Sequence, residues 1–200
     1  MEYGSEEWWE EVERLEEKAG GAFACTPPMR SATYRVLVES HLLTEFHFDL
    51  AGKIFGSAMP FGLYDPEGQL LPALKGVNVS VVVLLADIDE CREKSGRDLV
   101  SLYQQEGLSV LPLPIPNFGI PNWESLSDTL TETITRATQG QNILIHCSAG
   151  IGRTPLFAAL LAKKVLGLSG IEAIQWIWQN KPDALLTPPQ ILLIVEGDRN

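Results

Sequence analysis

Hydrophobic and polar positions alternate along the chain in the manner of a β-sheet covered by helices. Continuous β-branched runs at 78–87 and 141–147 predict strands that are buried on both faces. One or two short strands are expected within 46–60, and another within 108–115. Because these strands alternate with helical segments, the pattern indicates an α/β fold with a mostly parallel central sheet flanked by helices.

The helical segments are identified by their 3.6-residue period and by their end signals. Pro72 is a candidate start for the first helix, Gly107 closes the second, and Pro155 stands near the start of the fourth. A rigid Pro-rich loop is expected at 116–122. The predicted helices of this domain lie within 67–76, 91–107, 123–140, 154–166, 169–180 and 187–196.

A separate acidic helix is predicted at 5–21, where Ser5 is a candidate cap and two glycines end the segment. Two tryptophans, a valine and a leucine share one side of it. This side either packs on the main domain or binds a protein partner. We therefore divide the chain into an acidic helix with its connector, 1–30, and a single main domain, 31–200.

Charge and composition narrow the class of partner. The net charge is −11, and residues 1–20 hold eight Glu against one Arg and one Lys. An acidic surface disfavours nucleic acids and anionic membranes as partners. No apolar run approaches the roughly 18 to 20 residues that span a bilayer, and the first residues lack the pattern of a signal peptide. A cytoplasmic protein is therefore expected.

The chain has three widely separated cysteines and no CxxC or histidine cluster. This spacing predicts neither a disulfide framework nor a zinc site, and no metal or other cofactor is expected. The chemistry must then come from the side chains themselves.

The stretch "HCSAGIGRTP", residues 146–155, follows a buried strand and opens a helix. In α/β sheets, ligands bind beyond the carboxyl ends of the strands, where loop N–H groups and a helix N-terminus attract anions. Gly150 and Gly152 allow a tight curl of the backbone, and Arg153 offers a planar fork to two phosphate oxygens. Cys147 lies in the same positive field, which favours its thiolate form. The alternative is an ordinary buried cysteine in a strand–turn–helix.

The nine residues "HCSAGIGRT" resemble the HCxxGxGR[ST] signature of cysteine-dependent protein tyrosine and dual-specificity phosphatases. The order of elements is similar over about 46–196, and the small size resembles the compact dual-specificity branch. Neither the KNRY nor the WPD motif of larger tyrosine-specific domains is found. The resemblance implies a phosphatase P-loop between the last strand and the following helix, and a phosphatase-like catalytic domain at 31–200.

In such phosphatases the cysteine attacks phosphorus and forms a phosphocysteine, a role that the resemblance gives to Cys147. Arg153 would bind phosphate and stabilise the transition state, Thr154 would hydrogen-bond the sulfur, and His146 would orient the loop. The loop "LLTPPQ" resembles the family's TxxQ segment, so Gln190 is a candidate structural support, and Leu186 stands where larger enzymes have a water-positioning Gln. The phosphate-binding residues would be Ser148, Ala149, Gly150, Ile151, Gly152 and Arg153.

The family's general acid is an Asp on a mobile loop, about 30 residues before the cysteine. Here the matching residue in "LPIPNFGIPNW" is Asn117, and an amide cannot donate a proton as a carboxylic acid does. Three readings follow. The protein is a slow phosphatase, or it uses another carboxylate, or it is a phosphate-binding pseudophosphatase in which the Asn is natural or a trapping substitution. The other candidate carboxylates are Glu124, Asp128 and Asp87.

Leaving-group chemistry then selects the substrate. The phenol of tyrosine, with a pKa near 10, leaves without help more readily than a serine or threonine alkoxide, so a phosphotyrosine-bearing protein or peptide is the expected partner. No basic residue occupies the variable loop positions Ser148, Ala149 and Ile151, which argues against inositol lipids. Cys91 is either an ordinary loop cysteine or a redox partner of Cys147.

Overall fold

The computed structural model of this protein describes residues 42–197. The predicted helix 5–21 and the connector up to residue 30 lie outside the described residues, so both remain predictions. Within the part of the chain that is described, no helix is long and apolar enough to cross a membrane.

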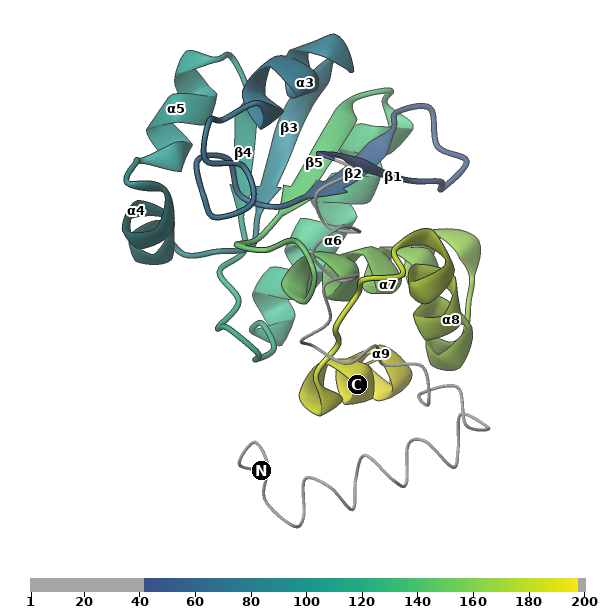
Figure 1. The fold of residues 1–200 in the computed structure, drawn as a ribbon. Helices are drawn as coiled ribbons and strands as arrows, with labels where there is room; N and C mark the ends of the chain where they lie inside the picture. Colours follow the sequence, from purple (N-terminus) through teal and green to yellow (C-terminus); the bar gives the residue numbers. More distant parts are fainter. Residues whose placement is uncertain (1–41, 198–200) are drawn as a thin grey trace.

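The described residues form a five-stranded sheet in which four neighbouring strands are parallel (Figure 1). The spatial order is β1-β2-β5-β3-β4, and only β1, at the edge, runs antiparallel to its neighbour. The expected α/β fold with a mostly parallel sheet is thus confirmed. The strands are β1 (Thr44–Phe46), β2 (Ile54–Ser57), β3 (Val79–Leu84), β4 (Ser109–Pro112) and β5 (Asn142–His146).

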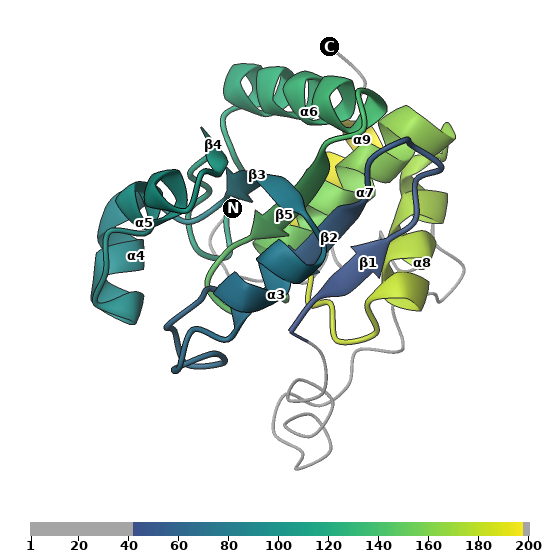
Figure 2. The ribbon, with the colours of Figure 1, turned by 90° about the horizontal axis from the view of Figure 1, so that it is seen from above.

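Helices cover both faces of the sheet, with α6 to α9 on one side and α3 to α5 on the other (Figure 2). The helices are α3 (Leu70–Gly76), α4 (Ile88–Ser95), α5 (Leu99–Gln105), α6 (Trp123–Thr138), α7 (Arg153–Leu166), α8 (Gly170–Asn180) and α9 (Pro188–Glu196).

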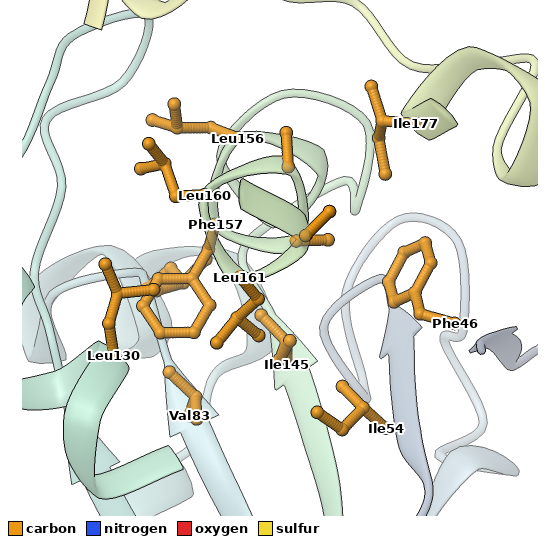
Figure 3. Packing of buried hydrophobic residues seen from close by; sticks show 14 of the residues in the cluster. Phe46, Ile54, Val83, Leu130, Ile145, Leu156, Phe157, Leu160, Leu161 and Ile177 are labelled. Carbon is orange, nitrogen blue, oxygen red and sulfur yellow. The ribbon is translucent and has the colours of Figure 1, made fainter. Parts of the chain in front are cut away.

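Two hydrophobic cores form because both faces of the central strands are apolar. In β3, Val81 and Val83 face the cluster under α6 to α9, while Val82 faces the cluster under α3 to α5. Phe157 of α7 lies over Val83 and Ile145 in the first cluster (Figure 3). α7 is buried along most of its length. This burial fixes the start of α7 against the end of β5, where the segment 146–155 lies.

Two of the expected helices differ from the structure. The single helix expected within 91–107 is two helices, α4 and α5, because Gly96 takes a left-handed φ of 66° that ends α4. Asp87 and Asp98 then cap the two helices separately. α3 begins before Pro72, because the carboxylate of the buried Asp65 accepts hydrogen bonds from the first N–H groups of that turn.

Candidate active site

The segment 147–152 forms a tight loop between β5 and α7, as the sequence predicts. Gly150 has a φ of 76°, and a Cβ at this position would lie 2.6 Å from the carbonyl oxygen of Ser57. Only glycine therefore fits here. The loop is braced on two sides: the N–H of Met59 donates to the Ser148 carbonyl at 2.9 Å, and that of Leu185 donates to the Ile151 carbonyl at 2.7 Å. This loop, residues 147–152, is called the cradle below, and segments distant in the sequence thus shape it.

The sulfur of Cys147 receives two hydrogen-bond donors from this loop and helix. The N–H of Gly150 lies 3.3 Å from Sγ, and the hydroxyl of Thr154 lies 3.4 Å from it. Cys147 is only 2% exposed. These two donors are placed to hydrogen-bond negative charge that develops on the sulfur. The structure thus brings Cys147, Gly150 and Thr154 together, as their spacing in the sequence predicts.

Arg153 is buried and is held by a carboxylate that sequence reasoning missed. Its Nη1 and Nη2 lie 2.6 Å and 2.7 Å from the two carboxylate oxygens of Glu90. Nη1 also donates to the carbonyl of Ile115 at 3.0 Å and weakly to that of Leu85 at 3.5 Å. Glu90 therefore fixes the guanidinium by its far end.

One edge of the guanidinium is not bonded to Glu90 or to these carbonyls, and Arg153 also interacts with Cys147. An arginine carries five N–H donors, and the contacts above engage both N–H groups of Nη1 and one of Nη2. The Nε–H and the second Nη2–H of Arg153 lie side by side in the same plane and are suited to two oxygens of a phosphate.

The ion pair is reflected in the titration of both partners. The hydrogen bonds from Arg153 lower the pKa of Glu90 from 4.5 to about 2, although burial alone would raise it. Burial works against the charge of Arg153, but the contact with Glu90 and the nearby Cys147 raise the pKa of Arg153 above its usual value. Both groups remain charged at neutral pH. The place of Glu90, in the first turn after the carboxyl end of β3, is the sequence signal that could have identified it.

His146 lies beneath the loop, as predicted, in a fixed neutral state. Burial lowers its pKa from 6.5 to about 4. Burial also raises the pKa of Tyr103 well above 10, so the phenol keeps its proton. Tyr103 Oη lies 2.8 Å from Nε2 of His146, whose Nδ1 lies 3.0 Å from the Cys147 carbonyl. A neutral imidazole satisfies both contacts when Nδ1 donates to that carbonyl and Nε2 accepts from Tyr103. Sequence reasoning missed Tyr103.

Asn117 lies on an exposed loop that follows β4 at the same edge of the sheet. Two side chains of the α9 N-terminus hold the next residues of this loop. The hydroxyl of Thr187 donates to the Phe118 carbonyl at 3.0 Å, and Nε2 of Gln190 donates to the Gly119 carbonyl at 2.9 Å. Gln190 is 1% exposed, and its Oε1 accepts from the Thr187 N–H. The loop that Gln190 contacts is thus the one that carries Asn117.

The three alternative carboxylates have different environments. Asp87 is the N-cap of α4 and accepts from the Glu90 N–H at 2.7 Å. Glu124 and Asp128 are exposed residues of α6, close in sequence to the Asn117 loop. The structure records no contact between any of these three carboxylates and the loop 147–152. Their role as a proton donor in place of an Asp at position 117 therefore remains a hypothesis.

Cys91 differs from the loop cysteine that the sequence suggested. It lies in α4 and is 2% exposed. Both Cys91 and Cys147 are free thiols, and they belong to the two different hydrophobic clusters. Burial, together with the nearby Glu90 and Asp87, raises the pKa of Cys91 to about 12. The redox pairing of Cys91 with Cys147 remains a prediction.

Comparison with known proteins places this site in a family context. Residues 62–165 match the family model described as "Tc-R-P: Polymorphic toxin system, DSP-PTPase phosphatase". Over 88 residues the chain is 33% identical to cyclin-dependent kinase inhibitor 3 of Mus musculus and 31% identical to that of Homo sapiens. Each match covers 44% of this chain and only 42% of the relative, so the chain spans less than half the length of these relatives.

Solved phosphatase structures share the fold. A kinase associated phosphatase, whose catalytic-site cysteine is replaced by serine, aligns with a TM-score of 0.70 at 21% identity, covering 78% of this chain and 92% of that one. The active form of Tk-PTP aligns with a TM-score of 0.63 at 27% identity, covering 78% and 98%.

Proposed function

Because the chain belongs to the DSP-PTPase phosphatase family of polymorphic toxin systems, we propose that it hydrolyses phosphotyrosine in proteins or peptides through a phosphocysteine. One observation carries this proposal. The sulfur of Cys147 lies under two hydrogen-bond donors, at the start of a helix whose first residue, Arg153, keeps one guanidinium edge for a phosphate.

In the proposed first step, the Cys147 thiolate attacks phosphorus in line with the ester oxygen. The S–P bond forms as the P–O bond to the tyrosine ring breaks, and the departing phenoxide takes up a proton from solvent water. Arg153 and the loop N–H groups stabilise the charge on the phosphoryl oxygens in the transition state. Glu90 keeps the guanidinium oriented for this purpose, because both of its oxygens are bonded to Arg153.

In the second step, water attacks phosphorus and releases a proton to solvent, and the S–P bond breaks so that the sulfur leaves as a thiolate. The hydroxyl of Thr154, 3.4 Å from the sulfur, supports that departure by hydrogen bonding. His146 stays neutral because its pKa is about 4, and it holds the Cys147 backbone rather than moving a proton. The products are inorganic phosphate and the dephosphorylated protein.

Asn117 limits the first step, because an amide does not protonate a leaving oxygen. General acid catalysis is typically worth about 10²–10⁴ in rate. Phenoxide leaves with less assistance than the alkoxide of serine or threonine. The proposed enzyme is therefore slow, and it is selective for phosphotyrosine and aryl phosphates over phosphothreonine.

The test compares a phosphotyrosine peptide with a phosphothreonine peptide of the same sequence. We expect the wild type to prefer phosphotyrosine, Cys147→Ser to be inactive, and Asn117→Asp to raise the phosphothreonine rate by at least about tenfold. Asn122→Asp is the matched control. Asn122 caps α6 in the same loop region, and Asp is an equally good cap. This variant therefore adds the same charge, and we expect no gain in the phosphothreonine rate.

Two results would count against this proposal. Equal wild-type rates on both peptides, together with a pH–rate profile that falls at higher pH as a carboxylic acid loses its proton, would indicate that Glu124, Asp128 or Asp87 supplies the proton. An Asn117→Asp variant no faster than wild type would indicate that the loop does not present this position to the leaving oxygen.

A second candidate is a phosphopeptide-binding module without turnover. The specific observation in its favour is the amide at Asn117 next to an otherwise complete cradle. Binding of a phosphotyrosine peptide by the wild type without release of phosphate would support it. Hydrolysis that is lost in Cys147→Ser would exclude it. Residues 1–30 as a partner-binding acidic helix, and a cytoplasmic location, remain predictions.

A further inference from the structure

Exposed apolar side chains gather at the edge of the sheet that carries the phosphate cradle. Single exposed hydrophobic residues are normal on protein surfaces, but a group of them marks an interaction site. Seven large hydrophobic residues of the described chain are exposed. Leu42 lies before β1, and the other six lie on the segments that follow β2, β3 and β4: Leu63, Tyr64, Ile88, Phe118, Ile120 and Trp123.

These three segments adjoin the cradle through contacts of their own. The segment after β2 donates from Met59 to the Ser148 carbonyl, and the one after β4 accepts from Arg153 at Ile115. The segment after β3 carries Glu90, which binds Arg153. The carboxyl ends of β2 to β5 point toward this common edge (Figure 1).

Leu63 is 84% exposed although its loop is firmly held. The neighbouring Phe61 has a φ of 59° and packs under the guanidinium of Arg97, 4.0 Å from its ring centre. On the other side, the buried carboxylate of Asp65 accepts hydrogen bonds from the N–H groups of Gln69 and Leu70. A rigid loop that presents an apolar side chain to water is prepared for a partner, because little conformational entropy is lost on binding.

Charges near the cradle define the partner further. The loop 113–123 and the variable cradle positions 148–152 carry no charged residue. Beside Ile88, the exposed carboxylate of Asp89 pairs with Arg92 at 3.7 Å, and Asp87 adds a second exposed carboxylate. These carboxylates and the net charge of −11 disfavour acidic segments and anionic bilayers.

We propose that this rim, defined by Leu63, Ile88 and Ile120, selects phosphotyrosine segments whose flanking residues are apolar and not acidic. The inference rests on the proposed function and names the substrate class within it. The phosphate enters the cradle, and the apolar flanks displace water from the rim side chains on either side. A bilayer is the other class of partner for an apolar rim, and the acidic charge of the chain disfavours it.

The test uses the full-length protein and three peptides that share one phosphotyrosine and differ only in flanks of Leu, Ser or Asp. We expect kcat/KM to be about tenfold higher for Leu than for Ser flanks, and lowest for Asp flanks. Leu63→Ser and Ile120→Ser should each bring the Leu-to-Ser ratio toward one. Leu108→Ser, an equally polar change at a partly buried leucine beside the amino end of β4, at the opposite edge of the sheet from the cradle, should leave the ratio unchanged.

Hydrolysis of a small aryl phosphate is measured alongside as a reference, since it needs the cradle and not the rim. If the wild type hydrolyses aryl phosphate but has the same kcat/KM for Leu-flanked and Ser-flanked peptides, the rim proposal is overturned and the proposed function still stands. Loss of both activities would instead argue against the function itself. Competition by phosphatidylcholine vesicles that disappears in Leu63→Ser would assign the rim to a membrane and overturn the proposal as well.

Discussion

Glu90 offers the sharpest test of how the cradle is held, because it is the only carboxylate recorded in contact with Arg153 among the described residues. Glu90→Gln keeps the size of the side chain and removes its charge. The buried guanidinium, whose side chain is 4% exposed, then lacks its counter-charge. Removing one partner of a buried ion pair is strongly destabilising, since the remaining charge stays desolvated.

The magnitude follows from the titration of Glu90. Its pKa falls from 4.5 to about 2 on folding, and each pKa unit corresponds to about 1.4 kcal/mol, so the charged carboxylate contributes about 3 kcal/mol above pH 5. The folded-state pKa is the lower one, so this contribution is complete above 4.5 and is lost as the pH falls toward 2. The difference between wild type and Glu90→Gln should therefore shrink by about 2 kcal/mol between pH 5 and pH 3.

Denaturant unfolding at pH 7, 5 and 3 measures this difference. Glu132→Gln is the matched control, because Glu132 pairs with Arg136 one turn away on the surface of α6, where such pairs are worth about 0.3–0.5 kcal/mol. Phosphate turnover should also fall in Glu90→Gln, by about 10²-fold if the guanidinium shifts by an ångström. If Glu90→Gln were as stable as Glu132→Gln at pH 7, the ion pair would not hold Arg153 and the reasoning would be refuted.

Two further predictions concern the supports of the site. Burial lowers the pKa of His146 from the ordinary 6.5 to about 4 in the folded protein. The unfolding free energy of the wild type should therefore fall by up to about 3 kcal/mol between pH 6.5 and pH 4. Denaturant titrations that show no change over this pH range would contradict the buried neutral state. Gln190→Met removes the donor to the Gly119 carbonyl and the acceptor for Thr187. It should cost about 1–3 kcal/mol and reduce the gain that Asn117→Asp gives on phosphothreonine peptides; an undiminished gain would mean that α9 does not position this loop.

Much of the fold could be read from local patterns. The buried strands, the long helices and the loop between β5 and α7 follow from apolar runs, helical period and glycines, which act over a few neighbouring residues. The two helix predictions that were wrong also have local causes. The left-handed turn at Gly96 divides one predicted helix into α4 and α5, and the Asp65 carboxylate, five residues away, sets the start of α3.

The site itself was only partly visible in the sequence. Cys147, Arg153 and Thr154 stand within one short motif, so their spacing alone predicts that they meet. Glu90 and Tyr103 lie 63 and 43 residues from the groups they contact. For Glu90 the sequence offers only its place just after the carboxyl end of a buried strand, and for Tyr103 it offers no local signal, because a tyrosine in a helix is common.

The sequence by itself determined the strands and the loop between β5 and α7, and it predicted an amide at the general-acid position, because each depends on residues that are neighbours in the chain. Only the tertiary structure decided what holds the cradle in place. Parallel pairing of β3 and β5 brings Glu90 to Arg153 and Tyr103 to His146, and the packing of α9 brings Gln190 to the Asn117 loop. These contacts satisfy buried charges and polar groups across long sequence separations, and burial, which gives them their strength, exists only once the chain has folded.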